Sequence, residues 1–215
     1  MSADTVIAAT ERDVGGAVAS VDARMLPETA FGLRNLPTWA TLGFILIEST
    51  TLIVAMTAYL YLRRNFAEWP PPPTPLPDVL IPSLNTALLL LIAVPMGIAG
   101  RAARALDLPR VRKALFVAVV LSAVCVVLRG FEFAALNTRW DSHAYGSVVW
   151  ALVGLHTTLL GIDLIETAVL TALTCSDALE QKHYTDIEDA ALYQFFLSLS
   201  WLPIYVLVFL GPRWL

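Results

Sequence analysis

Residues 145–174 read YGSVVWALVGLHTTLLGIDLIETAVLTALT, an almost wholly apolar stretch that is long enough to cross a membrane. A helix needs about 20 mostly apolar residues for this. The stretch nevertheless contains His156, Asp163 and Glu166, which lipid tolerates poorly. At positions i, i+7 and i+10 they share one stripe of the helix, and this stripe must face other helices. Counted from Tyr145, a core of about 30 Å ends near Glu166, so only His156 and Asp163 are predicted to lie deep.

The composition extends this conclusion to the whole chain. Of the 215 residues, 57% are hydrophobic and 15% charged, whereas a soluble domain has about 45–50% and about 25%. The apolar runs are continuous rather than alternating, which excludes a transmembrane β-barrel. The sequence therefore predicts an all-α, polytopic membrane bundle of five transmembrane helices, at residues 41–62, 79–99, 114–136, 145–173 and 187–210.

The distribution of basic residues predicts the orientation. The connection between the second and third spans contains five of them, and the positive-inside rule places it in the cytoplasm: Arg101, Arg104, Arg110, Arg112 and Lys113. With five spans, the N-terminus is then cytoplasmic and the C-terminus outside. Inner segments hold nine Lys and Arg residues and outer segments hold four, although the pair Arg63–Arg64 on the outer side counts against this arrangement.

Two segments outside the spans have a distinct composition. Residues 1–40 contain no unbroken apolar run, so we expect no signal peptide but a poorly ordered cytoplasmic segment, with the transmembrane domain at 41–215. Six of residues 70–77 are proline, which predicts a stiff, extended connection. Pro95 and Pro203 lie inside the second and fifth spans and should kink them.

Further charged side chains lie within the predicted spans. Glu48 is about two turns into the first span and is either hydrogen-bonded to a neighbouring helix or involved in lipid, proton or gas traffic. Arg129 and Glu132 are three residues apart and so share a helix face, where they can form a structural ion pair. The alternative for Arg129 is a contact with a lipid phosphate.

The residues offer no redox or catalytic centre in this chain. Haem ligation needs axial histidines, and only His156 of the three histidines lies in a span. A His, Cys or Met cluster for copper or iron is missing, as are a Gly-rich phosphate loop and a nucleophile–base arrangement. Cys125 and Cys175 are expected to be unpaired thiols. We therefore predict no active site, no metal site and no nucleic-acid partner.

Five stretches, in order and on the predicted helices, match the motifs of one family. They are ILIESTTLIVAMTAYLYL (45–62), PSLNTALLL (82–90), LRGFEF (128–133), YGSVVWALVGLH (145–156) and the aromatic spacing of Tyr193, Trp201 and Tyr205. Over about residues 40–213 the chain resembles subunit III of the haem–copper oxidases, in the short five-helix form of bacterial cytochrome c and quinol oxidases.

The chain departs from this family at several polar positions. A second histidine is usual three residues after the first, where this chain has Leu159, and a histidine and an aspartate are usual on the last helix, where it has Phe195 and Ser198. Asp163 is conversely not expected from the family. We therefore predict a rewired interior in which Asp163 hydrogen-bonds His156 or a neighbouring helix.

The resemblance implies a non-catalytic membrane subunit of a respiratory haem–copper oxidase, with haem and copper in partner subunits I and II. It implies that the chain stabilises the catalytic subunit and holds phospholipid in a V-shaped cleft between its first two helices and the rest. Glu48 and Glu132 would line this cleft, with Arg129 near lipid head groups.

Such a subunit would support aerobic electron transport and proton translocation in the bacterial inner (plasma) membrane, with either cytochrome c or quinol as electron donor. Two alternatives stay open: a subunit III-like protein of a nitric oxide reductase, and a free-standing transporter with Glu48, His156 and Asp163 as a proton relay. The chain has no internal repeat, which counts against a transporter.

Overall fold

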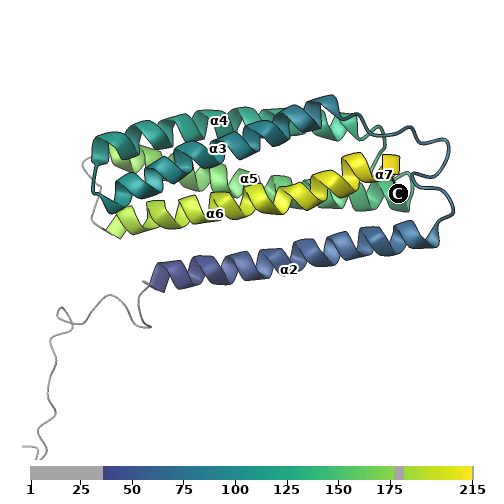
Figure 1. Ribbon diagram of the computed structural model, residues 1–215, viewed down its shortest axis with the longest axis horizontal. Coiled ribbons are helices and arrows are strands. Elements are labelled where there is room, and N and C mark those ends of the chain that lie inside the picture. The colour runs from purple at the N-terminus through teal and green to yellow at the C-terminus, as the bar shows by residue number, and fades with distance from the viewer. Residues whose placement is uncertain (1–35, 177–181, 215) are drawn as a thin grey trace, which may run out of the picture. The chain divides into compact units, whose positions relative to one another are not determined.

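The computed structural model describes residues 36–176 and 182–214, and within them every long element is a helix (Figure 1). The helices are α2 (Leu36–Asn65), α3 (Leu80–Arg104), α4 (Leu108–Ala135), α5 (Ala144–Cys175) and α6 (Lys182–Tyr205), with the π-helical η2 (Val206–Leu210) and the short α7 (Gly211–Trp214) continuing the last. Five helices in this part of the chain are long and apolar enough to cross a membrane, so the predicted five-span, all-α membrane protein is confirmed. Of the segment predicted to be poorly ordered, residues 1–35 lie outside the described ranges.

Local chemistry explains where several helices begin and end. Asp107 precedes α4 and its carboxylate accepts the backbone N–H of Arg110 at 3.3 Å, which satisfies a donor of the first turn. His143 plays the same part before α5, where its Nδ1 accepts the N–H of Gly146 at 3.0 Å. After α3, Leu106 adopts a left-handed conformation with φ 54°, and the N–H of Asp107 returns to the carbonyl of Ala102. Short helix ends of this kind allow the sharp reversal from α3 into α4.

Helices α3, α4, α5 and α6 form a four-helix bundle in which α3 and α5 each pack against α4 and α6. Large apolar side chains fill its interior, and small residues bring α3 close to α6. A Cβ atom placed on Gly100 would lie 3.1 Å from the Cβ of Ala191, so the two backbones approach closely there. Helix α3 is therefore an integral part of the bundle. The expectation that a cleft separates the first two helices from the rest is wrong, because the division falls between α2 and α3.

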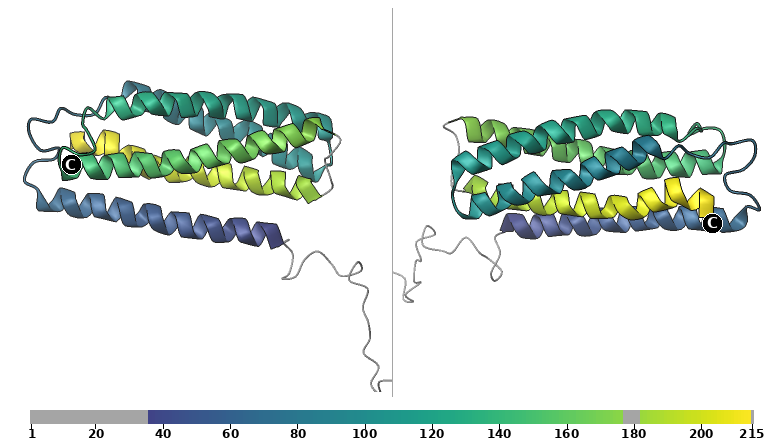
Figure 2. Two further views of the ribbon diagram at one scale, coloured as in Figure 1. Left: turned by 180° about the vertical axis from the view of Figure 1, so that it is seen from behind. Right: turned by 45° about the horizontal axis from the view of Figure 1, so that its top comes forward.

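Helix α2 lies beside the bundle rather than within it (Figures 1 and 2). Only 6% of its most apolar window is buried, against 33–39% for the other four spans. Its C-terminal part is held by Trp69, whose ring packs edge to face on Tyr59 of α2 at 5.4 Å and on Tyr145 of α5 at 5.0 Å. All three aromatic side chains are buried. Through these contacts, the C-terminal end of α2 packs against the bundle.

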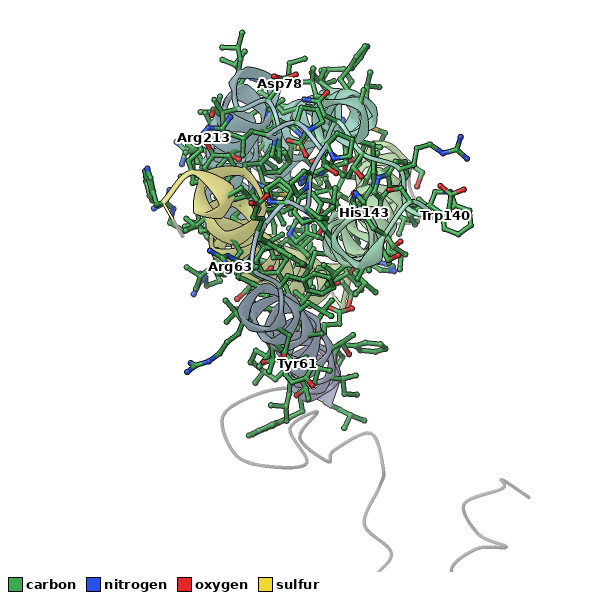
Figure 3. The ribbon with its side chains drawn as sticks, turned by 90° about the vertical axis from the view of Figure 1, so that its right-hand side faces the viewer. Tyr61, Arg63, Asp78, Trp140, His143 and Arg213 are labelled. Atoms are coloured by element: carbon green, nitrogen blue, oxygen red, sulfur yellow. The ribbon has the colours of Figure 1, made fainter. Side chains whose placement is uncertain are left out.

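The proline-rich connection (residues 66–79) contains no helix, as its composition predicts. It crosses the end of the bundle that Figure 3 faces, where Asp78, His143 and Arg213 lie around it and Trp140 projects from the edge. The N–H of Asp78 donates to the carbonyl of Ala135 at 2.8 Å, and Arg213 donates to the carbonyl of Pro77 at 2.6 Å. These hydrogen bonds fasten the connection to α4 and to the C-terminal end of the chain.

Candidate functional site

A charged centre lies fully buried between α4, α5 and α6. Arg129 and Glu132 of α4, 1% and 0% exposed, form the ion pair that their spacing allows. The ring centroid of Trp201, from α6, lies 3.6 Å from the Arg129 Cζ, which is a cation–π contact. The Arg129 Nη2 also lies 3.4 Å from the Nδ1 of His156 on α5. One guanidinium thus connects three helices.

The two neighbours of His156 determine its tautomer. The carbonyl of Leu197, 3.0 Å from Nε2, can only accept a hydrogen bond, and the guanidinium of Arg129 can only donate one. Nε2 therefore carries the hydrogen, and Nδ1 is the acceptor. With both ring nitrogens engaged, His156 can neither ligate a metal nor relay a proton without breaking one of these bonds.

Helix α3 joins the centre through Thr86. The indole Nε1 of Trp201 donates to the Thr86 hydroxyl at 2.8 Å, and that hydroxyl donates to the carbonyl of Pro82 at 2.7 Å. One turn away, the Ser198 hydroxyl of α6 donates to the carbonyl of Leu89 on α3 at 3.3 Å. The Arg129 centre, which we define as Arg129, Glu132, His156, Trp201 and Thr86, therefore connects all four helices of the bundle.

Asp163 lies outside this centre. It follows His156 by seven residues, about 10 Å along α5. Its side chain is 1% exposed, and both carboxyl oxygens lack a hydrogen-bond partner among the residues that the structure describes. The predicted hydrogen bond from Asp163 to His156 or to a neighbouring helix is therefore wrong, because Arg129 and Leu197 already satisfy the imidazole. Glu166, one turn further on, is exposed.

Glu48 occupies a third position, between α2 and the bundle. Its Oε2 accepts the hydroxyl hydrogen of Tyr193, from α6, at 2.7 Å. Tyr193 precedes Trp201 by eight residues, so Glu48 lies about 12 Å along α6 from the Arg129 centre. Glu48 and Glu132 do not line one common surface, since Glu132 faces the bundle interior. The structure thus brings together Arg129, Glu132 and His156 and leaves Glu48 and Asp163 apart.

Sequence reasoning missed Trp201 and Thr86 as partners of the charged residues. Both lie in the quoted motifs, but only the packing of α3 against α6 joins them. Across the described ranges, no group of three or more His, Cys, Asp or Glu side chains is placed to hold a metal ion. Cys125 is buried and Cys175 exposed, and each is a free thiol.

Comparison with known proteins decides the family. The sequence model of the family "Cytochrome c oxidase subunit III" matches residues 40–212. The chain belongs to the cytochrome c oxidase subunit III family. Proteins named cytochrome c oxidase subunit 3 are similar to it: that of Synechocystis sp. is 24% identical over 192 residues, 86% of this chain and 81% of the relative. That of Thermostichus vulcanus is 24% identical over 182 residues, 82% of this chain and 90% of the relative.

A relative from Paracentrotus lividus is 29% identical over 142 residues, 66% of this chain and 54% of the relative. The resemblance to subunit III that the sequence motifs indicate is thereby confirmed. The chain is a multi-pass membrane subunit of a multisubunit respiratory oxidase. Arg129 and Glu132 lie in the LRGFEF motif and His156 ends YGSVVWALVGLH, so the Arg129 centre is built on stretches that resemble this family.

Proposed function

We propose that this subunit III protein is non-catalytic and stabilises the catalytic subunit of a haem–copper oxidase, with haem and copper held by partner subunits I and II. The observation that supports this is that the side chains of the Arg129 centre are occupied by contacts with one another and with the surrounding helices. Its ion pair, cation–π contact and imidazole hydrogen bonds are all internal, and its charged side chains are 0–1% exposed. Groups so enclosed connect helices and have no access to a substrate. The chain would therefore support electron transport and proton translocation that partner subunits perform.

Helix α2 supports the second part of the proposal, the holding of phospholipid. Its apolar side chains are largely exposed, among them Phe44 at 63%, Leu46 at 69% and Val54 at 63%. A helix with such a surface is stable in a membrane when lipid tails or another subunit cover it. We place phospholipid between α2 and the four-helix bundle, beside Glu48, with the catalytic subunit against the remaining faces.

Co-purification and durability test this function. We expect a mild-detergent preparation isolated through this chain to contain a large polytopic partner and to show haem bands in a reduced-minus-oxidised spectrum. An oxidase complex prepared without the chain should keep its haem spectrum and initial rate but lose activity severalfold faster during sustained turnover. A colourless, partner-free protein would instead support the transporter alternative, and equal lifetimes with and without the chain would refute the stabilising role.

We also propose a cytoplasmic N-terminus, in the inner membrane of a bacterium. One end of the bundle carries the basic residues between α3 and α4, and the opposite end carries Arg63, Arg64, Arg139 and Arg213. In the proposed orientation, the end of α5, with Cys175, lies on the cytoplasmic side.

Native thiols report this orientation directly, since Cys175 is exposed and Cys125 buried. In right-side-out spheroplasts, a membrane-impermeant maleimide should label Cys175 only after permeabilisation. The variant Cys175→Ser should remain unlabelled throughout. Trp140→Cys, at the opposite end and with the native side chain 61% exposed, should be labelled without permeabilisation. Labelling of Cys175 in sealed spheroplasts would reverse the orientation.

A further inference from the structure

A cavity of about 780 Å³ opens where α4 ends and α5 begins. It is lined by these two helices, by the loop at residues 136–143 and by the proline-rich connection. This is the end of the bundle shown in Figure 3, with Trp140 at its edge, and His143 is one of the residues that line the cavity. The cavity is separate from the Arg129 centre and from the surface beside α2.

The floor of the cavity is apolar and belongs to the membrane spans. Phe133 of α4 and Trp150 of α5 stand with ring centroids 4.7 Å apart, and Gly130 and Ala134 complete the α4 side. A Cβ atom added to Gly130 would meet nothing within 4 Å, so the floor is open at this point. Trp150 is fixed by its Nε1, which donates to the carbonyl of Thr138 at 2.8 Å. This surface suits a hydrocarbon chain.

The rim of the cavity is polar and lies beyond the ends of the spans. The Arg139 Nε and Nη2 donate to the two carboxylate oxygens of Asp141 at 3.0 Å and 2.9 Å. These hydrogen bonds lower the pKa of the Asp141 carboxyl, which is therefore ionised at neutral pH. The Nδ1 of His143 accepts the N–H of Gly146, so its Nε2 carries the hydrogen and donates to the Thr74 hydroxyl at 2.7 Å. Arg139 lines the cavity, and Asp141 lies beside the lining and is bound to Arg139, so this edge presents one cation and one anion without net charge.

We propose that this cavity binds one zwitterionic phospholipid, with an acyl chain on the Phe133–Trp150 floor, the phosphate at Arg139 and the ammonium group at Asp141. The change from apolar floor to polar rim follows the step from membrane core to head-group level, where amphipathic side chains also gather. An anionic lipid would place its phosphate beside Asp141 with no ammonium group to compensate. A soluble phosphate would leave the apolar floor uncovered. The site is independent of the proposed oxidase role and of lipid beside α2.

Photolabelling of the reconstituted complex tests the proposal. Vesicles of phosphatidylethanolamine and phosphatidylglycerol would contain either lipid as a probe with a diazirine in its acyl chain, and labelled peptides would be identified by mass spectrometry. We expect the phosphatidylethanolamine probe to label residues 130–150 in preference to the phosphatidylglycerol probe. Gly130→Leu should reduce this labelling at least about tenfold, which corresponds to about 1.4 kcal/mol of lost affinity.

The matched control is Gly161→Leu, because Gly161 also has nothing within 4 Å of an added Cβ but lies deeper on α5 and does not line the cavity. It should leave the labelling unchanged. Asp141→Asn should shift the preference toward phosphatidylglycerol, since Arg139 is then the sole charge of the pair. Equal labelling by both probes, with no response to Gly130→Leu, would show that the cavity is not a selective lipid site and would overturn the proposal.

Discussion

Replacing Arg129 by methionine is expected to destabilise the folded subunit by about 3–5 kcal/mol, the cost of removing one partner of a buried ion pair. The substitution leaves the Glu132 carboxylate, 0% exposed, without a cation. It also removes the donor to the His156 Nδ1 and the cation over the Trp201 ring. Thermal unfolding of the detergent-solubilised complex, followed by helical circular dichroism and by loss of this subunit, measures the effect.

A matched surface pair provides the control. Asp107 and Arg110 also pair across three residues, but the Arg110 side chain is 77% exposed. Arg110→Met should therefore cost about 1 kcal/mol or less. In the double variant Arg129→Met/Glu132→Leu neither charge of this pair remains, so it should be more stable than the single variant. The assigned role of the pair would be contradicted if Arg129→Met were as stable as the unaltered chain. It would also be contradicted if the double variant lost more stability than the sum of the losses in Arg129→Met and Glu132→Leu.

The part of this centre that sequence could predict is the part that is local. Arg129 and Glu132 share a helix face because of their spacing alone. Trp201 and Thr86 are 115 residues apart, and they meet only because α3 packs against α6. The partner of the His156 Nε2 is the backbone carbonyl of Leu197, and a backbone carbonyl cannot be recognised from residue type. Contacts between helices are not visible in local spacing, which is also why the sequence predicts for Asp163 a hydrogen bond that is absent from the packed helices.

The five spans were predictable because a segment in lipid must satisfy its own backbone hydrogen bonds, so a long apolar run becomes a helix. The helices extend past the predicted spans, as α2 does from residue 41 back to Leu36, since a helix can continue beyond the apolar core. Hydropathy could not show which helix stands apart. Mean hydropathy is 1.7 for α2 and 1.9 for α3, yet their buried shares are 6% and 39%. Small residues such as Gly100 let the backbones of α3 and α6 approach closely, whereas α2 meets α6 through longer side chains such as Glu48.

Trp69→Ala is expected to cost about 3–5 kcal/mol, the usual range for truncating a buried aromatic side chain, and to release the C-terminal half of α2. Trp69 is 7% exposed and separates two fully buried tyrosines, Tyr59 of α2 and Tyr145 of α5. Since α2 buries little else against the bundle, few other contacts remain to hold it when those of Trp69 are lost. Hydrogen exchange measured by mass spectrometry should show faster exchange in α2 and in the proline-rich connection, with α3 to α6 unchanged.

Two variants distinguish the contacts of Trp69 from weaker effects. Trp140→Ala removes the same side chain at a 61% exposed position and should leave exchange in α2 unaltered. Tyr193→Phe removes only the hydrogen bond to Glu48 and should cost about 0.5–1.5 kcal/mol, with a smaller rise in exchange near the middle of α2. If Trp69→Ala accelerated exchange equally in all five helices, the tryptophan would stabilise the whole fold rather than the attachment of α2. If it changed nothing, two hydrogen bonds would suffice to hold α2, from Tyr193 to Glu48 and from Thr38 of α2 to Asp189 of α6 at 3.2 Å. The attachment of α2 would then be polar rather than aromatic.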